Sequence, residues 1–178
     1  MFAIVLAALA RSGSVLPILC AMAVHELAHV VMMLACGGQV RRLTLRFADL
    51  QIAASGLGYR QELLSALAGP VVNLICGAAF CMQRPSFAAY SLMLGIYNLL
   101  PVWPLDGGRM IRCALLARLP ITQAEHISEI VSFAACAVLL LIGVFLTFFR
   151  KSGLWPLGTA AYLTVRLLML ARRTDAVQ

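Results

Sequence analysis

The chain has 178 residues, of which 62% are hydrophobic and only 12% are charged, and its formal net charge is +7. Soluble domains carry about 25% charged residues, so this composition indicates a polytopic membrane protein and argues against a soluble enzyme. Most basic residues lie at the ends of apolar runs, where they suit the headgroups of a lipid bilayer rather than a nucleic acid. The six cysteines form no CxxC pairs and are expected to be free thiols.

The first long apolar run contains an unusual polar cluster. Residues 1–10 are apolar but too short to span a bilayer, and we expect a short or incomplete first helix there. Residues 15–35 have the length of a spanning helix and contain His25-Glu26-Leu27-Ala28-His29. Residues four apart share a helix face, so His25 and His29 can bind one metal ion. Glu26 beside them is a candidate general base, and a chance motif on a soluble core helix would rarely bury it unpaired.

A short β-hairpin is predicted after this helix. Gly37-Gly38 ends the helix, and polar and apolar residues then alternate over 42–47 and again over 49–52. Alternation of this kind predicts two strands. An open strand edge cannot face lipid, so we expect the hairpin at the membrane interface or along a cavity.

The middle of the chain is predicted to contain two further spans and an irregular segment. The first span, residues 61–82, includes Gly69-Pro70, which allow close helix packing or a kink, and Asn73, which needs a polar partner. The second begins at Phe87 and breaks over residues 98–109, which contain two prolines three apart. We expect Gly107-Gly108 to free the backbone around Asp106. Such a segment can line a wet cavity, although an interfacial loop is the alternative.

The rest of the chain is predicted to be helical. A short helix over 110–119 precedes a polar stretch, 121–129, in which Thr122 to Glu125 form a capping-box start for the next helix. Residues 130–149 and 154–171 are the last spans. The predicted fold is therefore an all-α polytopic membrane protein, a single domain over residues 1–178, with about five to six transmembrane helices and a small β-hairpin at the interface.

The basic residues also predict an orientation in the membrane. One side would carry nine of them, in the hairpin region, after the Asp106 segment and at the C-terminus: Arg41, Arg42, Arg46, Arg60, Arg109, Arg112, Arg118, Arg172 and Arg173. The other side would carry Arg11, Arg84, Arg150 and Lys151. Positive residues stay in the cytoplasm, so we expect a multi-pass protein of a bacterial cytoplasmic membrane with a cytoplasmic C-terminus.

A catalytic zinc site needs a third protein ligand besides His25 and His29. Among the seven acidic residues, only Asp106 combines a membrane setting with a Gly-rich flank, and we predict it to be that ligand. Alternatives that we disfavour are Cys20, Cys36 and the third histidine, His126. In this hypothesis zinc polarises the substrate carbonyl while Glu26 transfers the proton.

Two motifs in this order resemble a known family. His25-Glu26-Leu27-Ala28-His29 and the segment Asn98-Leu99-Leu100-Pro101-Val102-Trp103-Pro104-Leu105-Asp106-Gly107-Gly108 resemble the site-2 proteases, which are zinc intramembrane metalloproteases. The resemblance is greatest to the branch with the sporulation protease that processes a membrane-associated pro-sigma factor. It implies one Zn²⁺ per chain, cleavage of a peptide bond in or near the membrane segment of a membrane-associated protein substrate, and substrate contacts from Asn98, Pro101 and the hairpin around Leu45.

The chain also departs from that branch. Its first span is short or missing, and we expect no CBS-type or PDZ domain, so the chain resembles a minimal catalytic core that could work with a regulatory membrane partner. The alternative hypothesis is a metal-binding membrane protein or transporter without protease activity. Glu26 favours the protease, as does the convergence of the intramembrane polar groups on one predicted site.

Overall fold

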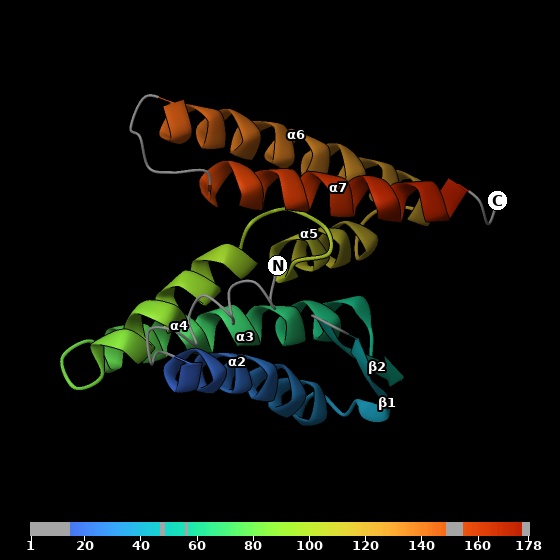
Figure 1. Ribbon diagram of the computed structural model, residues 1–178. Coiled ribbons are helices and arrows are strands. Elements are labelled where there is room, and N and C mark those ends of the chain that lie inside the picture. The colour runs from blue at the N-terminus through green and yellow to red at the C-terminus, as the bar shows by residue number, and fades with distance from the viewer. Residues whose placement is uncertain (1–14, 47–48, 56, 149–154, 176–178) are drawn as a thin grey trace.

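The computed structural model describes residues 15–46, 49–55, 57–148 and 155–175, so the predicted short first helix lies outside the described residues. The elements are α2 (Val15–Ala35), β1 (Gln39–Arg46), β2 (Asp49–Ser55), α3 (Tyr59–Ala79), α4 (Pro85–Asn98), α5 (Asp106–Leu116), α6 (Ile121–Phe148) and α7 (Trp155–Asp175). Helices α2, α3 and α4 pack together as one group and α6 packs on α7, while the short α5 contacts both α3 and α6 (Figure 1).

Two glycines end α2, and a glutamine side chain caps the start of α3. Gly37 has a φ of 82°, and the N–H groups of Gly37 and Gly38 donate to the carbonyls of Leu34 and Met33, which closes α2 in a Schellman motif. At the start of α3, Gln61 Oε1 accepts the N–H of Gly58, and Gln61 Nε2 donates to the Cys36 carbonyl. The two ends are therefore tied together at the base of the hairpin.

The segment between these ends forms two antiparallel strands. β1 pairs with β2 so that Arg46 lies opposite Asp49 and Leu45 opposite Leu50, with an irregularity between Val40 and Arg42. Both strands are longer than the alternating pattern predicts. The side chains of this region lie outside the described residues, and its position at a membrane interface stays a prediction.

The described helices are apolar outside and partly polar inside. On α2 the outward Leu16, Leu27 and Val31 are 71%, 60% and 57% exposed, whereas His25 and His29 are buried. Apolar surface of this extent is costly in water and suits lipid. Three of the described helices, α2, α3 and α6, are long and apolar enough to cross a membrane by length and composition. The predicted count of five to six spans stays a prediction.

The prediction that Gly107 and Gly108 free the backbone around Asp106 is wrong. Asp106 is the first residue of α5, and Gly107 and Gly108 lie in its first turn. A Cβ on Gly107 would overlap the Leu99 carbonyl oxygen, and one on Gly108 would lie 2.5 Å from the Trp103 nitrogen. These glycines therefore let the preceding segment pass close to the helix.

The predicted helix start at Thr122 is also wrong. α6 begins at Ile121, directly after Pro120, and runs without a break to Phe148, so the polar stretch 121–129 forms its first turns. The N–H of Ala124 donates to the Pro120 carbonyl at 3.0 Å and closes the first turn. Thr122 is consequently inside the helix, where it cannot act as an N-cap.

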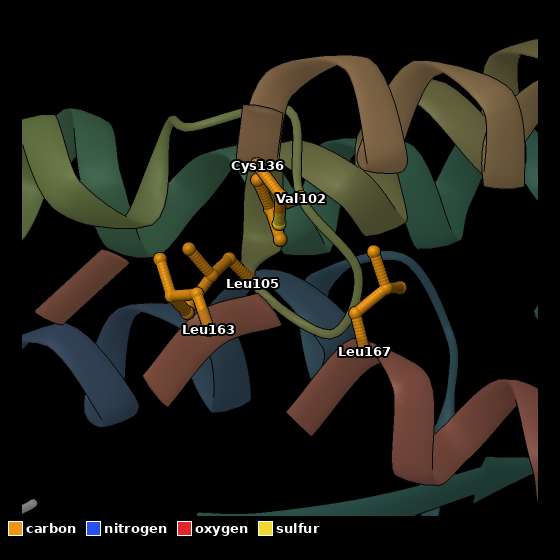
Figure 2. Packing of buried hydrophobic residues seen from close by; sticks show 5 residues of the cluster. All are labelled: Val102, Leu105, Cys136, Leu163 and Leu167. Carbon is orange, nitrogen blue, oxygen red and sulfur yellow. The ribbon is translucent and has the colours of Figure 1, made fainter. Parts of the chain in front are cut away.

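A hydrophobic cluster holds the segment before α5. Val102 and Leu105 from this segment pack with Cys136 of α6 and with Leu163 and Leu167 of α7 (Figure 2). Val102 has no exposed surface, and the neighbouring Trp103 N–H donates to Ser132 Oγ on α6 at 3.1 Å. Packing on both helices and a hydrogen bond to α6 thus fix the chain just before Asp106.

Candidate metal centre

Helix α2 presents the two histidines of the motif toward the interior. The residues His25 and His29 belong to one buried stripe of α2, together with Ile18, Ala21 and Met33. The two rings meet edge to face, with their centroids 4.7 Å apart and their Nε2 atoms 3.1 Å apart. The spacing of four residues therefore places both imidazoles at one point, as a helix requires.

Asp106, the first residue of α5, completes the cluster. Its Oδ2 lies 3.0 Å from His25 Nε2 and 3.1 Å from His29 Nε2, although 81 and 77 residues separate it from them. All three side chains are buried, and their ligand atoms lie within 4.8 Å of one another. Among the described residues, this is the one group of histidine, cysteine and acidic side chains close enough to hold a metal ion.

The hydrogen bonding of His29 tests whether a cation fits this cluster. His29 Nδ1 lies 2.7 Å from the Ser65 carbonyl oxygen, which can only accept, so Nδ1 must carry the proton. His29 Nε2 then presents a lone pair to the Asp106 carboxylate 3.1 Å away. Two electron-rich atoms this close need a proton or a cation between them.

The spacing and chemistry of the donors agree with zinc. Two ligands bound tetrahedrally to zinc lie about 3.4 Å apart, given bonds of about 2.1 Å. The three distances between the ligand atoms here are 3.0, 3.1 and 3.1 Å. Two imidazole nitrogens and one carboxylate oxygen are also a ligand set that zinc accepts at catalytic sites. The residues present therefore fit a zinc ion.

Helix α3 forms the wall of the cluster through one face. Ser65, Gly69 and Asn73 are four residues apart and all are buried. Ser65 Oγ donates to the His29 backbone carbonyl at 3.2 Å, and Asn73 Nδ2 lies 3.2 Å from His25 Nδ1. A Cβ on Gly69 would overlap His29 Nε2, so glycine is what allows the helix to approach the imidazoles this closely.

A cation lies next to the carboxylate. Arg109, one turn after Asp106 on α5, has one guanidinium nitrogen 3.7 Å from Asp106 Oδ1 and another 3.7 Å from Glu62 Oε1 on α3. Its side chain is about one-third exposed, so solvent weakens both interactions. Arg109 therefore links α5 to α3 beside the cluster, on the oxygen of Asp106 that does not face the histidines.

The other predicted site residues come from α2, from the end of α4, from the segment before α5 and from β1. Glu26 follows His25 on α2 and is partly buried. Asn98, the last residue of α4, donates from Nδ2 to the Leu94 carbonyl at 3.1 Å, and Pro101 is partly buried in the segment before α5. Leu45 lies on β1, and its side chain is outside the described residues.

Sequence reasoning missed the wall of the site. The stretch from Ala68 to Asn73 resembles the middle-helix motif of the site-2 proteases, and the sequence predicts close packing at Gly69 and a polar partner for Asn73, but it indicates no contact with the histidines and does not single out Ser65. The signal was present, because small and polar residues recur every fourth position on an otherwise apolar helix. Of the disfavoured alternatives, Cys20 and His126 are exposed. Neither belongs to the metal-binding group.

Comparisons with known proteins agree with the resemblance seen in the motifs. Residues 84–142 match the family described as Peptidase family M50. The stage IV sporulation protein FB of Bacillus subtilis is 27% identical over 138 residues, which cover 70% of this chain and 47% of that protein. A zinc metalloprotease of Methanocaldococcus jannaschii is 25% identical over 133 residues, covering 67% of this chain and 39% of that protein.

A solved structure extends the likeness to the fold. The site-2 protease from Methanocaldococcus jannaschii superposes with a TM-score of 0.69 at 19% identity, over 94% of this chain and 85% of that one. The resemblance to the site-2 proteases is thereby confirmed in sequence and in fold. The chain nevertheless spans less than half the length of the two curated relatives described above.

Proposed function

We propose that this chain, which carries a Peptidase family M50 segment on the fold of a site-2 protease, is a zinc-dependent intramembrane endopeptidase. One observation carries the proposal. Two imidazole nitrogens and a carboxylate oxygen, from helices far apart in the sequence, converge in the interior of helices whose outward faces are apolar. A buried site of this composition suits the hydrolysis of a substrate that lies in the membrane.

The catalytic roles follow from the chemistry of the residues. His25, His29 and Asp106 would hold one zinc ion per chain. When bound, zinc supplies Lewis acidity, which polarises the scissile carbonyl and makes a water molecule acidic near neutral pH. Glu26 then takes a proton from the attacking water onto its carboxylate and returns it to the nitrogen of the leaving amine.

The substrate must expose its backbone before this chemistry is possible. A transmembrane helix engages its carbonyls in bonds to residues four positions along, so the helix has to unwind near the cut. The freed N–H and C=O groups need partners where bulk water is scarce. We propose that β1 pairs with the unwound segment by strand addition, and that Asn98 and Pro101 contact it near the metal site.

The register of the hairpin supports a role for Leu45. Antiparallel pairs alternate between those that exchange hydrogen bonds and those that do not. Of the adjacent pairs Arg46–Asp49 and Leu45–Leu50, one therefore exchanges hydrogen bonds across the hairpin and the other does not. We propose that Leu45–Leu50 is the second kind, so that the Leu45 N–H points to the outer edge of β1, where an added strand would bind.

The substrate class and the orientation are also proposals. The Bacillus subtilis relative is named a sporulation protein, and we propose a membrane-associated precursor of a transcription factor as the substrate. The excess of arginine near the hairpin and α5 favours a cytoplasmic position for these elements and for the C-terminus of a protein in the bacterial cytoplasmic membrane. The product would then be released toward the cytoplasm.

The substitution Glu26→Gln tests the proposed function. The amide has nearly the same shape but cannot take a proton, so zinc should stay bound while cleavage falls at least about 100-fold. The measurement is cleavage of co-expressed membrane-tethered transcription-factor precursors, with zinc content determined on the same preparations. Glu129→Gln, at an exposed position on α6, is the matched control and should cleave normally.

Three outcomes separate the hypotheses. Loss of cleavage with retained zinc in Glu26→Gln supports the protease. Cleavage at the wild-type rate in Glu26→Gln would assign the proton transfer to another group. Zinc binding without cleavage of any precursor by the wild-type protein would favour the alternative, a metal-binding membrane protein or transporter.

A further inference from the structure

Asn73 is a fully buried amide that contacts a proposed ligand of the metal. It lies on α3 with no exposed surface, and its Nδ2 is 3.2 Å from His25 Nδ1. Its Oδ1 is buried and has no hydrogen-bond partner among the described residues. A buried polar atom without a partner costs folding free energy, so its presence calls for an explanation.

The two histidines of the cluster are supported differently. His29 donates its Nδ1 proton to the Ser65 carbonyl, which leaves the lone pair of Nε2 directed at the cluster. His25 instead faces the Nδ2 of an amide, which has protons to donate and no lone pair to offer. In this arrangement His25 Nδ1 is the acceptor, so the proton of a neutral ring lies on Nε2 and occupies the position of the metal.

Metal binding requires the opposite tautomer of His25. A zinc ligand gives the lone pair of Nε2, so the ring proton must move to Nδ1 and needs an acceptor there. The Asn73 oxygen is on the same amide as the nitrogen now facing His25. A half-turn about the Cβ–Cγ bond exchanges the two atoms without moving the helix.

We propose that Asn73 is a positioning residue that accepts the Nδ1 proton of His25 through Oδ1 when the metal is bound. The inference rests on the proposed zinc site. It assigns to α3 the support of both histidines, through the Ser65 carbonyl for His29 and through the Asn73 side chain for His25. The amide would thereby fix the ring orientation and make Nε2 of His25 a stronger ligand.

Two substitutions at this position separate an acceptor from a mere space-filling residue. Asn73→Asp keeps an oxygen acceptor and removes the donor, whereas Asn73→Leu keeps the branching at Cγ and removes both. We expect Asn73→Leu to weaken zinc affinity about 10- to 100-fold, the usual effect of losing such a partner of a ligand histidine. Asn73→Asp should bind zinc with an affinity closer to the wild type, because a carboxylate is also an acceptor.

The measurement is zinc affinity by competition with a chelator in detergent-purified protein. Thermal unfolding of the metal-free variants shows whether each one is folded. Ser91→Ala is the matched control: Ser91 on α4 is also fully buried, and its hydroxyl has no hydrogen-bond partner in the described part of the chain, but it does not belong to the metal-binding group. This variant should bind zinc as the wild type does.

The possible results distinguish the inference from the proposed function. Wild-type zinc affinity in Asn73→Leu would overturn the inference and leave the zinc site intact. An affinity of Asn73→Asp as low as that of Asn73→Leu, in folded protein, would also overturn it, because the acceptor would then be irrelevant. A wild-type protein that binds no zinc would refute the proposed function and the inference together.

Discussion

Gly69 offers a sharp test of how closely α3 must approach the metal-binding group. In Gly69→Ala, the new Cβ would overlap His29 Nε2 and would lie 2.5 Å from His29 Cε1 and 2.9 Å from His25 Cε1. Ordinary contacts of a Cβ are 3.4–4 Å. Both imidazoles are themselves buried, so neither ring can turn away into solvent.

The size of the displacement sets the expected effect. The rings must move by about 1 Å to remove the overlap, whereas ligand distances at a metal site vary by only about 0.2 Å. We therefore expect zinc affinity to fall by at least about 10-fold, on the scale of lost support for a ligand. Overpacking should also cost about 1–3 kcal/mol of stability, although alanine is otherwise favoured over glycine in a helix by about 1 kcal/mol.

Zinc affinity and thermal unfolding in detergent measure the two effects separately. Gly158→Ala on α7 is the matched control, because a Cβ at Gly158 meets no atom within 4 Å. It should bind zinc normally and be as stable as the wild type or more stable. Wild-type zinc affinity in Gly69→Ala would refute the close approach of α3 to the two histidines.

Three further predictions concern orientation and substrate binding. For orientation, single cysteines are introduced as Arg42→Cys and Gln178→Cys into a cysteine-free protein. An impermeant thiol reagent applied from outside should label neither position, and labelling of both would show the opposite orientation. Asn98→Ala should keep zinc and slow cleavage about 5- to 150-fold, because a backbone group of the bound substrate loses its partner at a cost of about 1–3 kcal/mol. Leu45→Pro removes an N–H from the edge of β1 and should slow cleavage without loss of zinc. The slowing should be smallest for substrates that already carry helix-breaking residues at the cleavage site. Wild-type rates in both variants for every substrate would contradict strand addition.

The ligand set could be predicted because each part of it leaves a local mark in the sequence. His25 and His29 are four residues apart within an apolar run, which settles both the helix and the shared face. Asp106 stood out because few acidic residues lie in apolar segments. The structure places these three side chains together, although their roles as ligands stay predictions.

Features that depend on tertiary contacts could not be predicted in the same way. Gly107 and Gly108 indicated flexibility when read locally, yet they lie in a helix where the carbonyl of Leu99 passes close by. Helix α6 begins directly after Pro120, whose carbonyl accepts the N–H of Ala124. The pattern from Thr122 to Glu125 resembles a capping box, but Thr122 lies inside the helix. The role of the face with Ser65, Gly69 and Asn73 became visible only when α3 was placed against the imidazoles.

Metal content of purified protein tests the central claim most directly. The proposed site predicts one zinc per chain in the wild-type protein, because three ligand atoms of His25, His29 and Asp106 converge on one point. Asp106→Ala removes one of the three and should lower the zinc content markedly, as should His25→Ala. Unchanged zinc content in Asp106→Ala, with complete loss in His25→Ala, would contradict the assignment of Asp106 as the third ligand.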